Sequence, residues 1–112
     1  MTVNEKMMQA LGDFDLPTAY AIYQGDAAEY FVFVFSIIPV MYADDRPNTE
    51  RYLTQLHYFC PHDVDCTKLR QAVKAKLFAA GWTWPDEVDA TDETSRHYVF
   101  ECEIMGEMDG TV

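Results

Sequence analysis

Residues 29–38 constrain the fold of this chain most, because they predict a β-strand that is apolar on both faces. Successive side chains of a strand point to opposite faces of the sheet. One face of this strand carries Tyr30, Val32, Val34 and Ile38, and the other carries Phe31, Phe33, Phe35 and Ile37. Burying each of these side chains is worth about 1.5–3 kcal/mol, so an uncovered face would forfeit on the order of 6–12 kcal/mol, comparable to the stability of a whole domain. One face must therefore meet the helices, and the other must meet either the other helix or a neighbouring subunit.

The first helical pattern covers Val3–Leu11 and has its apolar residues on one stripe. Thr2 and Glu5, three residues apart, have the spacing of a capping box, in which each side chain satisfies a free backbone N–H group at the start of a helix. Gly12 follows as a stop signal. These three signals together predict a short amphipathic helix.

A second helix is the clearest element of the sequence. Asp65 or Thr67 can cap its start, and Gly81 is well placed at its end. Its apolar residues recur at spacings of three and four and are Leu69, Ala72, Val73, Leu77 and Ala80.

The segments around the central strand predict a hairpin and a turn. Residues 18–24 are short and rich in Tyr and Ile, and Gly25-Asp26 separates them from the central strand, so the two segments read as a β-hairpin. Pro39 ends the good strand pattern, although residues 40–42 can continue it past a bulge.

The remaining extended segments alternate with polar loops. A polar turn at residues 44–48 leads to a strand at residues 50–59, and an extended segment at residues 82–85 leads to an acidic loop at residues 86–93. Residues 97–105 close the fold with the alternation of a half-buried strand.

These elements predict the α+β class, with an antiparallel β-sheet and two helices packed on it, in the order α-β-β-β-α-(β)-β; the brackets mark the segment at 82–85. We expect a single domain over residues 1–112, with a structured core at 1–105 and a flexible tail at 106–112. A chain of 112 residues, 49% of them hydrophobic, can bury one core without disulfides or metals.

The charge balance restricts the partners of this protein. Nineteen acidic residues against eight basic ones give a net charge of −11, which repels phosphate backbones and anionic membranes. We therefore expect neither specific nucleic-acid binding nor membrane binding, and the longest apolar run is too short to span a bilayer. Three cysteines and the absence of a secretory pattern favour a reducing cytosol with free thiols.

One group of residues has the chemistry of a zinc site, and these residues are His57, Cys60, His62 and Cys66. The group lacks a CxxC pair, and strand alternation points His57 away from the face that Tyr58 and Cys60 share. We therefore predict a strand-to-helix loop with incidental Cys and His residues, and no bound metal.

Nothing in the sequence predicts an enzyme or a cofactor. Cysteines and three histidines permit a Cys–His pair, but no local signature supports one, and Cys102 fits a small core residue. The chain has no G-x-S-x-G, phosphate-binding or dinucleotide-binding motif. Of the two neighbouring tryptophans, Trp82 and Trp84, we expect one ring in the core and the other partly exposed. The paired acids lie in predicted loops, where we expect solvated charge, and are Asp44-Asp45, Asp86-Glu87 and Asp92-Glu93.

The basic residues are concentrated on the second helix, which holds four of the eight: Lys68, Arg70, Lys74 and Lys76. From Gly81 onward the sequence has nine acidic residues and a single basic one, Arg96. This basic helix is either a solvated face or one half of a self-complementary surface, suited to head-to-tail contacts that close a ring. We take it, with the acidic turn Asp44-Asp45 and Trp84, as the candidate interface with other subunits or partners.

The layout also resembles a specific family. The resemblance spans about residues 1–105 and rests on the segments Tyr30-Phe31-Val32-Phe33, Ala43-Asp44-Asp45, Glu50 through Pro61, Lys68-Leu69-Arg70, Ala80 through Pro85 and His97 through Glu103. In these segments and in the order of its elements the chain is similar to small prophage proteins of the head–tail joining region, in particular the tail-terminator or tail-completion proteins of long-tailed phages.

This resemblance implies a structural virion protein that assembles as a ring of identical subunits, a hexamer by expectation. The ring would cap the head-proximal end of the tail tube, stop tube growth and join the tail-tube protein to a head-completion or connector protein. It would be made in the host bacterial cytoplasm and end in the virion tail. An acidic surface would suit a channel through which DNA passes without sticking.

Three other readings stay open at this point. Another head–tail connector or stopper component is close to the first reading. A small α+β module that binds a ligand between sheet and helices belongs to a different class, and an enzyme that uses Cys or His is the least supported.

Overall fold

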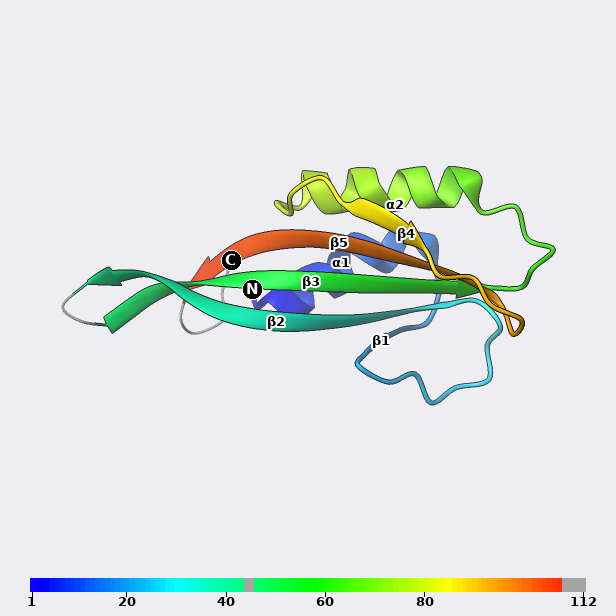
Figure 1. Ribbon diagram of the computed structural model, residues 1–112, viewed down its shortest axis with the longest axis horizontal. Coiled ribbons are helices and arrows are strands. Elements are labelled where there is room, and N and C mark those ends of the chain that lie inside the picture. The colour runs from blue at the N-terminus through cyan, green and yellow to red at the C-terminus, as the bar shows by residue number, and fades with distance from the viewer. Residues whose placement is uncertain (44–45, 108–112) are drawn as a thin grey trace.

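The computed structural model describes residues 1–43 and 46–107, with the side chains of all of these except 41–43 and 46–48. The fold is α+β, with two α-helices and a five-stranded, mostly antiparallel sheet, as the sequence predicts (Figure 1). Neither helix in this part of the chain is long and apolar enough to cross a membrane. The elements are α1 (Val3–Leu11), the 3₁₀ turn η1 (Gly12–Phe14), β1 (Thr18–Tyr20), β2 (Tyr30–Ala43), β3 (Arg46–Cys60), α2 (Thr67–Ala79), β4 (Asp86–Asp89) and β5 (Arg96–Glu107).

The strand order is β1-β2-β3-β5-β4, and every neighbouring pair except the first is antiparallel. β1 lies parallel to β2, with Thr18 opposite Phe31. The predicted hairpin between residues 18–24 and the central strand is therefore wrong. The chain leaves β1 at Ala21, whose φ of 66° is in the left-handed region, and loops back to the start of β2, so both strands run the same way (Figure 1).

β2 continues through Pro39 without the predicted bulge and keeps one register with β3 from Tyr30 to Ala43. The backbone N–H of Phe31 and the backbone carbonyl of Phe33 form hydrogen bonds on the β1 side. The backbone N–H and C=O groups of the odd-numbered residues of β2 therefore point to the outer edge of the sheet. Pro39 is one of these positions, and its missing N–H group costs no ladder hydrogen bond. A proline at this edge position therefore does not interrupt the strand.

The ends of the long strands reach further than predicted. β3 begins at Arg46, so the predicted turn at residues 44–48 is shorter than the sequence indicates, and residues 44–45 lie outside the described part. β5 continues to Glu107, so the first two residues of the predicted tail at 106–112 belong to a strand. Hydrogen bonds to neighbouring strands thus extend both β3 and β5 into segments whose polar sequence predicts a turn or a tail.

Both helices pack on one face of the sheet. Apart from Val99 on β5, the buried positions are odd-numbered in β2 and even-numbered in β3 and β5, and the register places these on the same side. Of the two alternatives for covering the second face, the other helix is therefore ruled out. The largest fully buried side chains are Trp82, Tyr58, Phe31, Phe33, Phe100, Met7, Leu11, Leu56, Leu77, Val3, Val73 and Thr54.

The predicted capping box of α1 is confirmed. The backbone N–H of Glu5 donates to Thr2 Oγ1 at 3.1 Å, and the backbone N–H of Thr2 donates to Glu5 Oε1 at 3.2 Å. The bond from the Thr2 N–H, together with one from the Thr2 hydroxyl to Glu5 Oε1 at 2.9 Å, lowers the pKa of the Glu5 carboxyl. The local sequence thus fixes where α1 begins.

The end of α2 is also as predicted. Gly81 has a φ of 113°, and the N–H of Trp82 donates to the carbonyl oxygen of Leu77 at 3.1 Å, which is the hydrogen bond of a Schellman motif. At the start of the helix, the N–H of Thr67 donates to Asp65 Oδ1 at 3.1 Å. This C-terminal motif turns the chain so that the Trp82 ring enters the core, where only 2% of the residue is exposed.

Candidate interaction surface

The face of the sheet opposite the helices is called the open face below, since neither helix lies on it. It is formed by the even positions of β2 and the odd positions of β3 and β5. Its main side chains are Tyr30, Val32, Val34, Ser36 and Ile38 from β2, Arg51, Leu53, Gln55, His57 and Phe59 from β3, and His97, Val99, Glu101, Glu103 and Met105 from β5. The doubly apolar strand therefore has its phenylalanine face in the core and its other face without a helix.

The sheet also extends beyond the helices at the hairpin end (Figure 1). Ile37 is 49% exposed and Ile38 is 37% exposed, although they point to opposite faces of β2. In contrast, Phe31 and Phe33 are 0% and 1% exposed on the same strand. From Ser36 to Pro39 all four residues of β2 are exposed, so this part of the strand, called the projecting arm below, carries exposed apolar side chains on both faces.

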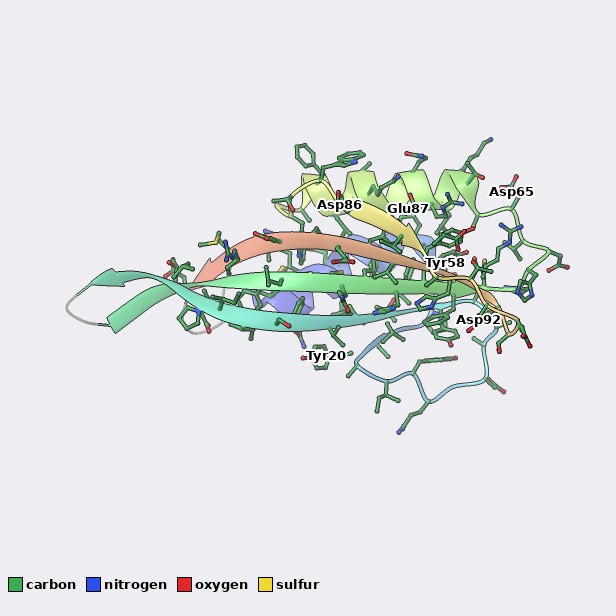
Figure 2. The ribbon with its side chains drawn as sticks, in the orientation of Figure 1. Tyr20, Tyr58, Asp65, Asp86, Glu87 and Asp92 are labelled. Carbon is green, nitrogen blue, oxygen red and sulfur yellow. The ribbon has the colours of Figure 1, made fainter. Side chains whose placement is uncertain are left out.

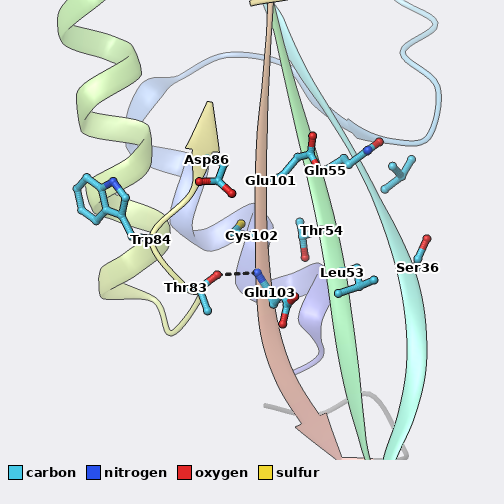
Figure 3. A pocket seen from close by; sticks show the side chains of 11 residues that line it. Ser36, Leu53, Thr54, Gln55, Thr83, Trp84, Asp86, Glu101, Cys102 and Glu103 are labelled. Atoms are coloured by element: carbon cyan, nitrogen blue, oxygen red, sulfur yellow. Dashed lines mark hydrogen bonds between the residues drawn. The ribbon is translucent and has the colours of Figure 1, made fainter. Parts of the chain in front are cut away.

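One cavity, of about 570 Å³, lies across the hairpin half of the open face (Figure 3). Val34 and Leu53 form its apolar part, and Trp84, which is 53% exposed, lies at its β4 side. Its carboxylates are those of Asp86, Glu101 and Glu103. Arg51 Nε lies 3.9 Å from Glu103 Oε2, which is at the outer limit of an ion pair. This groove therefore has an apolar floor and a mostly acidic rim.

A second cavity, of about 320 Å³, occupies the other half of the open face and shares Val34 with the first. A row of stacked rings borders it. Tyr23 stacks on Tyr30 with ring centroids 4.3 Å apart, Tyr30 on Phe59 at 4.8 Å, and Phe59 on His97 at 4.2 Å. Tyr23 belongs to the loop between β1 and β2, so part of this loop lies against the open face.

The row of rings ends in a histidine pair that joins two neighbouring strands. His57 Nδ1 and His97 Nε2 lie 2.8 Å apart and share one hydrogen bond. Partial burial lowers the pKa of both imidazoles, because the protonated form loses hydration there. His57 and His97 are therefore neutral near pH 7. His57 lies on this face, as strand alternation predicts, but its pairing with His97 was not predicted, because it depends on the register between β3 and β5.

The acidic residue that the sequence analysis most misjudged is Glu87. The predicted acidic loop at 86–93 begins with β4, and Glu87 lies between this strand and α2 (Figure 2). Arg70 Nε donates to Glu87 Oε2 at 2.6 Å, and Lys74 Nζ donates to Glu87 Oε1 at 2.7 Å. Burial alone would raise the pKa of Glu87, but the two cations more than offset this and lower it. Glu87 is thus an anchor between strand and helix, and the prediction that it is a solvated loop charge is wrong.

This anchor changes the reading of the basic helix. Arg70 and Lys74 face β4, and Lys76 pairs with Asp13 of η1. Lys68 is exposed and has no ion pair within the described residues. A reversal of Arg70 and Lys74 to Glu would place carboxylates beside Glu87, so we expect this change to weaken the packing of β4 against α2. Of the four basic candidates, Lys68 is the most available for an external contact.

The other candidate residues have separate positions. Asp44 and Asp45 lie outside the described residues. Asp92, in the loop before β5, accepts the backbone N–H groups of Thr94 and Ser95, and these hydrogen bonds lower the pKa of its carboxyl. Trp84 is exposed while Trp82 is buried, which confirms the prediction for this pair.

The four metal-ligand candidates do not form a site. Cys60 and Cys66 are buried in the core, His57 is on the open face, and His62 donates from Nε2 to the carbonyl oxygen of Asp92 at 2.7 Å. Within residues 1–43 and 46–107 no three His, Cys, Asp or Glu side chains are grouped to hold a metal ion.

The cysteines are three free thiols, all of them buried. Burial raises the pKa of Cys60, and it raises the pKa of Cys102 to about 12, so these two groups are protonated near pH 7. Cys102 is a core residue, as predicted.

Comparison with known proteins identifies the fold only. No protein-family model matches the sequence, and no curated protein matches it. A solved structure with 13% sequence identity is similar over 90% of this chain and 90% of its own, with a TM-score of 0.61, and nothing in that protein's name states a function.

Proposed function

We propose that the chain is a structural subunit of a phage virion without enzymatic activity. In this proposal it assembles as a ring on the head-proximal end of the tail tube and joins the tube to the head connector. The observation that carries the proposal is the open face, a sheet surface with apolar and aromatic side chains that the chain's own helices leave uncovered. A subunit that is complete only within an assembly has such a surface.

Two further features support this role. The projecting arm carries exposed apolar side chains on both faces, including Ile37 and Ile38, and it extends a molecule whose longest dimension is 54 Å. A net charge of −11 is compatible with a ring around DNA, because the phosphates of the passing duplex would be repelled rather than bound. The resemblance in sequence layout to tail-terminator proteins gives the specific place in the virion.

The test is inhibition of tube growth. The purified chain is mixed with the tail-tube protein encoded in the same gene cluster, and tube lengths are measured by negative-stain electron microscopy. We expect shorter tubes with a ring at one end. The variant Leu53→Asp, which places a charge in the open face, should lose this effect, whereas Met8→Asp, at an exposed position of α1, should keep it.

A chain that neither binds the tube nor changes its length would refute the proposed terminator role. Binding to a head connector protein without any effect on tube length would instead assign the chain to the neighbouring connector or stopper role.

A small-molecule-binding module is a second candidate, favoured by the cavity of about 320 Å³ beside the row of rings. Its walls are mostly aromatic, and cavities of this size hold small ligands. Thermal-shift screening with aromatic compounds would test it. This candidate would be favoured over the ring subunit by a compound that binds the wild-type chain but not Tyr30→Ala, if the wild-type chain also has no effect on tube growth.

A further inference from the structure

The shape of the open face restricts what can cover it. Two cavities that meet at Val34 hollow the face along most of its length. If two open faces met, their hollows would enclose a void, and the lining side chains would lose dispersion contacts. A convex element such as a helix can fill the hollow instead. The cover is therefore expected to be a different surface from the open face itself.

The outer side of α2 has such a convex surface. Lys68, Gln71, Ala75 and Phe78 are exposed at spacings of three and four, so they form one stripe, called the α2 stripe below. Phe78 is 58% exposed, and its one aromatic pair among the described residues is with Trp84, at a centroid distance of 5.6 Å and an interplanar angle of 64°. Phe78 does not contribute to the chain's own core. The buried residues of α2 are Val73 and Leu77, on the opposite side of the helix.

The charges of the two surfaces are complementary. The rim of the larger cavity carries the exposed carboxylates of Asp86 and Glu101. The α2 stripe carries Lys68, which has no ion pair of its own in the part of the chain that the structure describes. Opposite charges at the edge of an apolar contact fix its orientation.

From these three observations we propose that the α2 stripe of one copy packs into the open face of a second copy. Each sheet is then covered on one side by its own helices and on the other by a neighbour's α2. This contact joins two different surfaces, so repetition around an axis can close a ring. The inference rests on the proposed function for its partner, a second copy of this chain, and it names the surfaces that meet.

Cross-linking between two variants, each with one introduced cysteine, tests the contact directly. Gln55→Cys lies on the open face and Ala75→Cys lies on the α2 stripe, and both positions are exposed. The native thiols are buried, so a short bis-maleimide should react at the introduced cysteines. We expect a covalent dimer when the two variants are mixed and none when either is treated alone. Met8→Cys, exposed on α1, is the matched control and should not cross-link with either variant.

A charge exchange sharpens the test. Lys68→Glu and Glu101→Lys should each lower the yield of the mixed dimer several-fold, and combining them in the contacting copies should restore it. Gln55→Cys protein that links to itself would show that two open faces meet and would overturn the inference. The absence of a mixed dimer, or an equal yield with Met8→Cys, would also overturn it.

These outcomes are separate from those of the tube-growth assay. A chain that caps tubes but gives no mixed dimer refutes only the contact between the α2 stripe and the open face. A mixed dimer from a chain that leaves tube growth unchanged refutes only the role in the tail.

Discussion

Two residues of the doubly apolar strand should respond very differently to the same truncation. Phe33 and Ile37 point to the same face of β2, but Phe33 is 1% exposed beneath the helices and Ile37 is 49% exposed on the projecting arm. Phe33→Ala removes a fully buried ring and should cost about 3–5 kcal/mol of unfolding free energy. Ile37→Ala removes a side chain that is already half in water and should cost at most about 1 kcal/mol.

The size of these effects makes them easy to separate. Unfolding entropy of about 2.1 cal/mol/K per residue converts the loss for Phe33→Ala into a fall in Tm of about 13–21 °C for this chain, against a few degrees for Ile37→Ala. Urea denaturation followed by tryptophan fluorescence gives the free energies directly. The packing argument would be refuted if Phe33→Ala cost less than about 1 kcal/mol, or if the two variants lost equal stability.

Three further predictions concern polar groups. Glu87→Gln should lower the unfolding free energy measured by urea denaturation by about 1–3 kcal/mol, because it leaves two cations facing a neutral amide. The difference from wild type should shrink as the pH falls below 4.5, because the wild-type carboxyl, whose folded pKa is lowered, then becomes protonated as well. A difference that does not change with pH would contradict the ion-pair account. The wild-type unfolding free energy should fall as the pH drops below 6.5, because the unfolded chain protonates at His57 and His97 more readily than the folded one, and replacing both by Phe should flatten this slope. Thr54→Val should cost about 1–3 kcal/mol, because the Trp82 indole N–H, which donates to Thr54 Oγ1 at 3.0 Å, would be buried without an acceptor; Thr54→Ser is the control that should keep most of the stability.

Local signals were sufficient wherever a short segment fixed its own backbone. The capping box at Thr2 and the glycine at Gly81 placed one end of each helix correctly, because the hydrogen bonds involved are made within a few residues. Alternation placed the closing strand, since Cys102 and its even-numbered neighbours share the buried face.

Predictions failed where a distant segment supplied the deciding contact. The parallel placement of β1 depends on a loop that returns to β2 from outside the sheet, and no turn residue encodes that path. Glu87 had the composition of a loop, yet β5 supplies its backbone pairing and α2 supplies Arg70 and Lys74. The pair of His57 and His97 brings together residues 40 positions apart, which required the strand register.

The sequence by itself determined that the central strand is apolar on both faces and that both faces favour cover. This conclusion follows from side-chain alternation and the free energy of burial, which need no tertiary information. Only the tertiary structure decided that both helices lie over Phe31 and Phe33, and that neither helix covers the face of Val34. The reason is physical: which side of a sheet a helix occupies depends on the connections between elements and on packing among distant side chains, and neither is written in the period of a single strand.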